Sequence, residues 1–128
     1  MNRRTYYLTD TALVHLEKAI RDTARRWDLD QAATYRDALL NGFQDIAENH
    51  KGFNFLHRND LAKGTDFSLH LVEHHYVAFK ARENGDVIIV GLFYERMNIP
   101  VRLKELQCMS LPEIAALEDE IEREAAEL

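Results

Sequence analysis

The sequence predicts one α+β domain, in which a helical hairpin packs on one face of an antiparallel sheet. Two adjacent segments, residues 13–27 and 32–46, repeat apolar side chains at helical spacing, and three later segments have strand patterns. The predicted order is β-α-α-β-β-β, followed by an added C-terminal helix. Two amphipathic helices joined by about three residues form a hairpin that needs a sheet to cover its apolar stripe.

The first strand is expected at residues 4–9, which are rich in aromatic and β-branched side chains. Thr9 or Asp10 can cap the first helix, because a short side-chain oxygen accepts hydrogen bonds from the free N–H groups of the first turn. Asp28 or Asp30 can cap the second helix in the same way. Large apolar residues are usually buried, so four of them are expected in the core. They are Leu8, Leu16, Trp27 and Phe79.

Three further strands are expected after a polar connection at residues 49–64. Residues 67–72 and 76–81 supply two of them, and the apolar run 87–93 supplies the central strand. Asn84-Gly85 marks the hairpin turn, since both residues tolerate positive φ. Pro100 cannot donate a hydrogen bond to a neighbouring strand, so the sheet should end near residue 99.

The C-terminal region differs from the rest in charge. Residues 1–108 contain 15 acidic and 15 basic side chains, whereas residues 109–128 contain seven acidic and one basic. Ser110 to Glu113 form a capping box with Pro112 in the first turn, which predicts a helix that begins there. We therefore expect two units, a domain at 1–108 and an acidic helix at 109–128. The helix either packs on its own domain or forms a partner or self-association surface.

Composition narrows the functional classes. One cysteine, Cys108, cannot form an internal disulfide, and the longest apolar run is too short to span a membrane. Without a signal peptide, a cytoplasmic protein is expected. Residues 1–108 carry no net charge and the terminal helix is acidic, so neither part attracts the phosphates of nucleic acid. Direct nucleic-acid binding is therefore not expected. The histidine spacing predicts no metal site, and no cofactor is expected.

Four segments together resemble ParE-type toxins of the RelE/ParE superfamily. Tyr7-Leu8-Thr9, followed by Ala12 and Leu16, is similar to the opening segment of that family. The other three segments are Trp27 with Gln31-Ala32 and Tyr35, then His75 to Lys80, and last Tyr94 to Pro100. Tyr94 stands where the family often has histidine. The resemblance covers most of residues 4–106.

This resemblance implies the toxin of a type II toxin–antitoxin system, neutralised by a cognate antitoxin. ParE members are associated with inhibition of DNA gyrase, which makes gyrase the expected target. The residues expected to bind the target are Tyr94, Arg96, Met97, Asn98 and Arg102. An arginine at a polar strand end is a donor fork suited to a partner's carboxylate or phosphate.

Two alternatives stay open. One is a RelE-like, ribosome-dependent mRNA endoribonuclease, which needs a general base, cations and a general acid but no metal. The residues that could supply these groups are Lys51, Arg58, Arg82, Tyr94 and Arg96. The other alternative is a protein-binding relative that has lost toxicity. For the gyrase-directed toxin no catalytic residue is expected, because protein binding is its activity.

Overall fold

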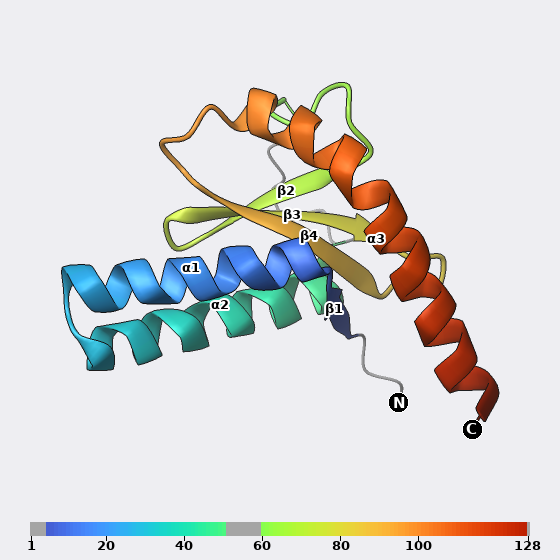
Figure 1. Ribbon diagram of the computed structural model, residues 1–128, viewed down its shortest axis with the longest axis horizontal. Helices are drawn as coiled ribbons and strands as arrows, with labels where there is room; N and C mark the ends of the chain where they lie inside the picture. Colours follow the sequence, from blue (N-terminus) through green and yellow to red (C-terminus); the bar gives the residue numbers. More distant parts are fainter. Residues whose placement is uncertain (1–4, 51–59, 128) are drawn as a thin grey trace.

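The computed structural model describes residues 5–50 and 60–127. The elements follow in the order β1 (Tyr6–Leu8), α1 (Asp10–Arg26), α2 (Leu29–Asn49), β2 (Ser68–Val72), β3 (His75–Ala81), β4 (Val87–Tyr94) and α3 (Ile99–Glu127). The α1–α2 hairpin covers one face of the sheet, and α3 lies across the other face (Figure 1). This arrangement confirms the predicted α+β class.

The sheet has the strand order β1-β4-β3-β2. β2 and β3 pair antiparallel, as do β3 and β4, whereas β1 pairs parallel with β4. The sheet is therefore mixed. No short turn joins β1 to β4, so packing rather than local turn chemistry sets their relative direction.

Both predicted helix caps on the hairpin are confirmed. The Thr9 side chain accepts a hydrogen bond from the Ala12 backbone N–H at 3.1 Å, and Asp28 accepts one from Gln31 at 2.7 Å. The predicted turn between β3 and β4 is also present. Gly85 adopts a φ of 98°, which a residue without a Cβ reaches at little cost.

Strand β4 lies between two apolar layers. Phe43, Val77 and Ile89 belong to the layer beneath the helical hairpin. Ile88 and Leu103 belong to the layer beneath α3. Alternate side chains of a strand point to opposite faces, so a strand covered on both faces reads as the continuous apolar run seen in this sequence.

The expectation that Trp27 belongs to the core is wrong. Its side chain is 73% exposed, while Leu16 and Phe79 are buried as expected and Leu8 is partly buried. The buried positions of α1 end at Ala19. The apolar stripe of the helix therefore continues past the part that packs against the core.

The expected start of the last helix at Ser110 is also wrong. Helix α3 begins at Ile99, where Pro100 occupies the first turn, and Pro112 lies inside the helix. Ser110 is fully buried, and its hydroxyl donates to the Leu106 carbonyl at 2.6 Å instead of capping a helix. One buried face runs through the whole segment, and its packing offsets the hydrogen bond that Pro112 cannot make. It consists of Ile99, Leu103, Leu106, Ser110 and Ile114.

The predicted division between residues 108 and 109 falls within α3. The helix continues across this point without a break, and residues from both sides of it pack against the same face of the sheet. Ile114 is buried and Leu117 is partly buried there. The first half of the acidic region is thus part of the domain's own packing.

Candidate partner-binding groove

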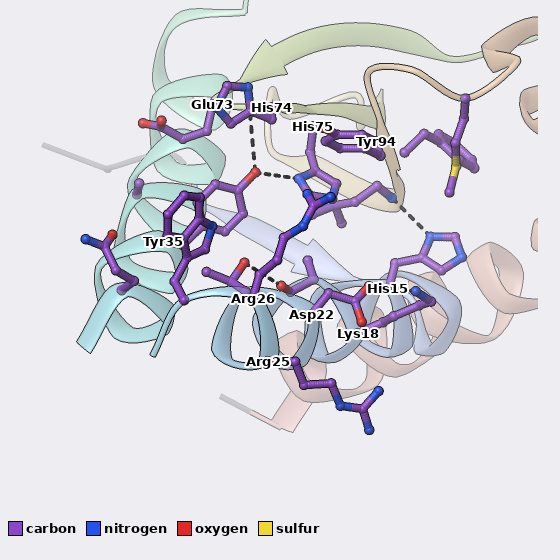
Figure 2. Close-up of a pocket in the computed structure, with 18 of the residues that line it drawn as sticks. His15, Lys18, Asp22, Arg25, Arg26, Tyr35, Glu73, His74, His75 and Tyr94 are labelled. Atoms are coloured by element: carbon purple, nitrogen blue, oxygen red, sulfur yellow. Dashed lines mark hydrogen bonds and ion pairs between the residues drawn. The ribbon is translucent and has the colours of Figure 1, made fainter. Parts of the chain in front are cut away.

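A groove with a volume of about 1210 Å³ lies between the helical hairpin and the ends of β3 and β4. Residues from α1 and α2 form one wall, and the β2–β3 turn, the end of β4 and the start of α3 form the other (Figure 2). The groove combines aromatic, basic and histidine side chains. Among them are Lys18, Arg26, Trp27, Tyr35, His75, Tyr94, Met97 and Arg102.

A hydrogen-bonded network forms one end of the groove. The Tyr35 hydroxyl lies 2.6 Å from His75 Nδ1 and accepts a hydrogen bond from the His74 backbone N–H at 3.3 Å (Figure 2). When the neutral ring carries its proton on Nε2, the hydroxyl donates this hydrogen bond to His75 Nδ1. Burial lowers the pKa of His75, and the neighbouring His74 lowers it further. Burial also raises the pKa of Tyr35.

A second histidine binds the edge of β4. His15 Nδ1 accepts a hydrogen bond from the Leu92 backbone N–H at 3.1 Å. β1 pairs with β4 only as far as Ile89, so beyond that point this edge has no neighbouring strand within residues 5–50 and 60–127. His15 satisfies one of the free donors on this edge. Burial lowers the pKa of His15, although Glu113 acts in the opposite direction. A Cβ on Gly91 would lie 3.2 Å from His15 Nδ1, so glycine leaves room for the ring.

Positive side chains outnumber negative ones along the groove. Lys18, Arg25, Arg26 and Arg102 line it, against Asp22 and Glu73. Lys18 pairs with Asp22 at 2.7 Å, which leaves a net positive groove on a chain of net charge −6. Arg26 extends across the groove toward His75, whereas Arg25 points away (Figure 2).

Exposed apolar side chains accompany these charges. Trp27 lines the groove and is 73% exposed, and Leu29 beside it is 79% exposed. Met97 adds a further exposed apolar group. Tryptophan and arginine are enriched among residues that dominate protein–protein binding energy. This combination suits a protein segment that carries apolar and acidic side chains.

Three of the five residues predicted to bind the target line the groove. They are Tyr94, Met97 and Arg102. Arg96 is exposed on the turn between β4 and α3 and does not line it. Asn98 sits directly before α3, and its side chain accepts a hydrogen bond from Val101 N–H at 3.5 Å. This placement gives Asn98 a helix-capping role.

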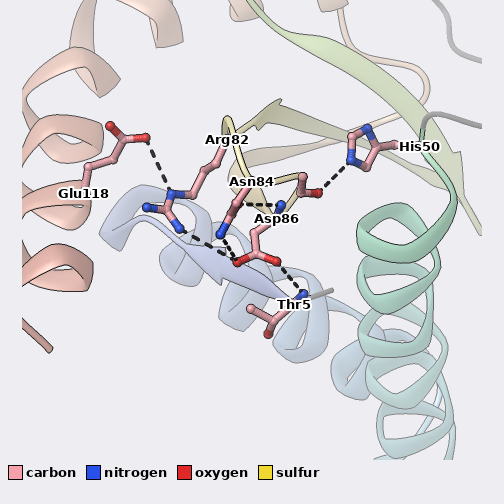
Figure 3. Close-up of polar contacts among 7 residues, drawn as sticks. Thr5, His50, Arg82, Asn84, Asp86 and Glu118 are labelled. Carbon is pink, nitrogen blue, oxygen red and sulfur yellow. Dashed lines mark hydrogen bonds and ion pairs between the residues drawn. The ribbon is translucent and has the colours of Figure 1, made fainter. Parts of the chain in front are cut away.

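Arg82 lies at the other end of the sheet from Tyr94. It follows β3 directly, where Ala81 pairs with Val87, whereas Tyr94 ends β4 opposite His75. Its guanidinium lies 3.8 Å from carboxylate oxygens of both Asp86 and Glu118 (Figure 3). Strand β4 has eight residues and separates Arg82 from Tyr94 by roughly 20 Å.

The remaining residues of the ribonuclease set, Lys51 and Arg58, lie outside the described residues. Within the described part of the chain, Tyr94 and Arg96 are therefore the two members of that set found near one another. Residues 5–50 and 60–127 also contain no group of three His, Cys, Asp or Glu side chains that could hold a metal ion. None of the helices described in these ranges is long and apolar enough to cross a membrane.

Most of the residues that line the groove were not predicted from the sequence. Trp27 was assigned to the core, and His15, Lys18 and Arg26 were not identified. His15 carried a usable signal, because it lies three residues after Ala12 and four before Ala19, on the buried side of α1. A histidine on the apolar side of a helix requires a polar partner from another element.

Comparison with known proteins agrees with the fold. The family model for the ParE toxin of the type II toxin–antitoxin system, parDE, matches residues 6–99. No curated protein matches the sequence closely enough to count as a relative. The match begins at β1 and ends at the first residue of α3, so almost all of α3 lies outside it. Since the matched residues make up well over half of the chain, this protein belongs to the ParE toxin family of type II toxin–antitoxin systems.

Proposed function

We propose that the free protein inhibits DNA gyrase and that a cognate antitoxin neutralises it by occupying the groove. Membership of the ParE family implies an antitoxin partner. The observation that carries the proposal is the exposed Trp27 in a groove also lined by Tyr94, Met97 and Arg102. Such a surface supports protein binding as the activity. The protein would act in the cytoplasm, where gyrase works.

The ribonuclease alternative receives less support. A general base, a cation and a general acid must converge within hydrogen-bond reach of one phosphate. Arg82 lies at the far end of β4 from Tyr94 and is engaged by Asp86 and Glu118. This separation favours a protein-binding toxin over a nuclease that uses the residues predicted from the sequence.

Supercoiling by purified gyrase tests the proposal directly. The wild-type chain should block supercoiling, and Trp27→Ala and Arg102→Ala should each weaken inhibition by roughly tenfold or more, the size typical of a binding hot spot. Glu83→Ala, an exposed change on the β3–β4 turn, serves as the matched control and should inhibit like wild type.

Two further assays separate the alternatives. Expression in cells should induce the DNA-damage response if gyrase is the target. Cleavage of ribosome-bound mRNA with intact supercoiling would replace the proposal with the ribonuclease. Absence of both activities, with retained antitoxin binding, would identify a relative that has lost toxicity.

A further inference from the structure

The distal part of α3 extends beyond the domain. Leu117 is the last side chain of α3 that packs against the apolar layer of the sheet. From Asp119 to Glu127 every residue except Ile121 is exposed. We name residues 119–127 the acidic segment, because it contains five acidic side chains and one basic one, Arg123. This segment lies outside the part of the chain that matches the ParE family.

The acidic segment is an amphipathic helix. Ile121 and Ala125 lie four residues apart and continue, past the domain, the apolar face on which Leu117 packs against the sheet. Carboxylates occupy most of the remaining surface. Amphipathic helices bind other proteins by placing such a face in an apolar groove, with the flanking charges facing opposite charges on the rim. The segment is therefore suited to bind a groove that is lined by basic and apolar side chains.

The groove described above meets those requirements. Arg26 and Arg102 supply positive charge, with Arg102 lying 3.8 Å from Glu105 of its own helix. Trp27 supplies an exposed apolar surface. The chain thus carries an acidic amphipathic helix and a basic, aromatic groove. The two are complementary in charge and in the kind of side chain that each exposes.

One molecule cannot make this contact with itself. The C-terminal end of α3 lies at the opposite end of the molecule from the α1–α2 turn, beside which the groove opens (Figure 1). The acidic segment continues a single helix from Ile99 and cannot fold back. In two molecules related by a two-fold axis, the end that carries the segment of one would lie beside the end that carries the groove of the other.

We propose that the acidic segment of one molecule docks in the groove of a second copy, forming a reciprocal dimer that covers Trp27. The contact is electrostatic at its rim, so added salt weakens it. The dimer occupies the surface that an antitoxin or target requires. Reciprocal docking of the acidic segments thus blocks the groove of each molecule, and the dimer dissociates on dilution.

Trp27 allows a direct test, since it is the one tryptophan of the chain. Light scattering should give twice the monomer mass at low salt and the monomer mass on dilution. The emission of Trp27 should shift to shorter wavelength as the dimer forms, and high salt should reverse both changes. A chain that stays monomeric up to about 1 mM, a concentration that populates even weak dimers, would overturn the proposal.

Charge reversal identifies the surfaces. Glu120→Lys with Glu124→Lys should raise the dimer dissociation constant by roughly tenfold or more, because the helix then repels the groove. Asp45→Lys with Glu83→Lys is the matched control, since it makes the same charge change at exposed positions elsewhere. The control should dimerise like wild type. A dimer that survives the first pair with unchanged Trp27 emission must use another interface, and the proposal fails.

A mixture of two variants completes the test. Arg26→Glu with Arg102→Glu reverses the groove and should also weaken self-association. Mixed with the Glu120→Lys, Glu124→Lys variant, it should form a heterodimer, because both segment–groove contacts then join opposite charges. Failure of the mixture to associate would show that the two surfaces do not meet.

Discussion

The carboxylate of Glu113 in α3 is hydrogen-bonded to two groups of Thr11 at the start of α1. It accepts hydrogen bonds from the Thr11 backbone N–H and from the Thr11 hydroxyl, each at 2.8 Å. A negative charge at a helix N-terminus is stabilised by the free N–H groups and by the helix dipole. A residue far along the chain thus caps the first helix and fixes α3 to the hairpin layer.

Loss of this contact should reduce stability. Glu113→Ala should lower the free energy of unfolding by about 1–2 kcal/mol, the usual value of a helix cap. Glu120→Ala, an exposed change on the same helix, should leave it nearly unchanged. Urea unfolding measures both. Thr11→Val removes the hydroxyl bond and keeps the backbone one, so a double-mutant cycle with Glu113→Ala should show coupling, and purely additive effects would contradict the hydroxyl bond.

Trp27→Ala should change stability little. The side chain is 73% exposed, so its truncation leaves no cavity, and we expect a change within about 0.5 kcal/mol. Phe43→Ala provides the comparison in the core. Because Phe43 is fully buried, this substitution should lower the free energy of unfolding by about 3–5 kcal/mol. Thermal or urea unfolding of the two variants distinguishes them. A loss as large for Trp27 as for Phe43 would place the indole in the core.

Arg96→Ala should leave the fold intact. Its side chain is exposed on the turn between β4 and α3, so its removal disrupts no buried contact. Circular dichroism and the unfolding midpoint should match wild type, whereas inhibition of gyrase should be reduced. An unfolded variant would instead identify Arg96 as part of a structural ion pair.

Gly91→Ala should destabilise the contact between α3 and β4. The new Cβ would lie 2.8 Å from Leu106 Cδ2 and 3.2 Å from His15 Nδ1, so both side chains must move. Overpacking of this kind costs about 1–3 kcal/mol. Urea unfolding measures the loss. Gly91→Ala should cost less stability in a Leu106→Ala background than in wild type if the clash is its cause, and an equal cost in both backgrounds would place the strain elsewhere.

Stability should rise with pH across the range in which histidine titrates. Burial lowers the pKa of both His15 and His75 in the folded protein, so the folded state binds fewer protons than the unfolded chain. Their contribution is complete above the unfolded value of about 6.5 and is lost as the pH falls through the folded values. Urea unfolding between about pH 5 and 8 measures it.

A variant isolates the histidine contribution. His75→Phe keeps an aromatic ring but removes the titrating group, so its stability should depend less steeply on pH than that of wild type. The carboxylates titrate in both proteins, so their contribution to the pH dependence cancels when the two slopes are compared. Equal slopes would show that His75 does not contribute.

The sequence determined those parts of the fold that depend on neighbouring residues. Thr9 and Asp28 cap helices because their side chains reach N–H groups three residues ahead, and Gly85 turns the hairpin through its own backbone freedom. The apolar run of β4 indicated a central strand, and β4 lies between β1 and β3. Each of these features acts over a few residues, so a local pattern was enough to predict it.

Tertiary packing decided the rest. Trp27 follows the helical stripe but lies beyond the part of α1 that the core covers, which no periodicity reveals. Ser110 and Pro112 form a local start signal, yet the apolar face from Ile99 to Ile114 outweighs it by packing on the sheet. The groove joins residues 15 to 102 from separate elements, and only the folded chain brings them together.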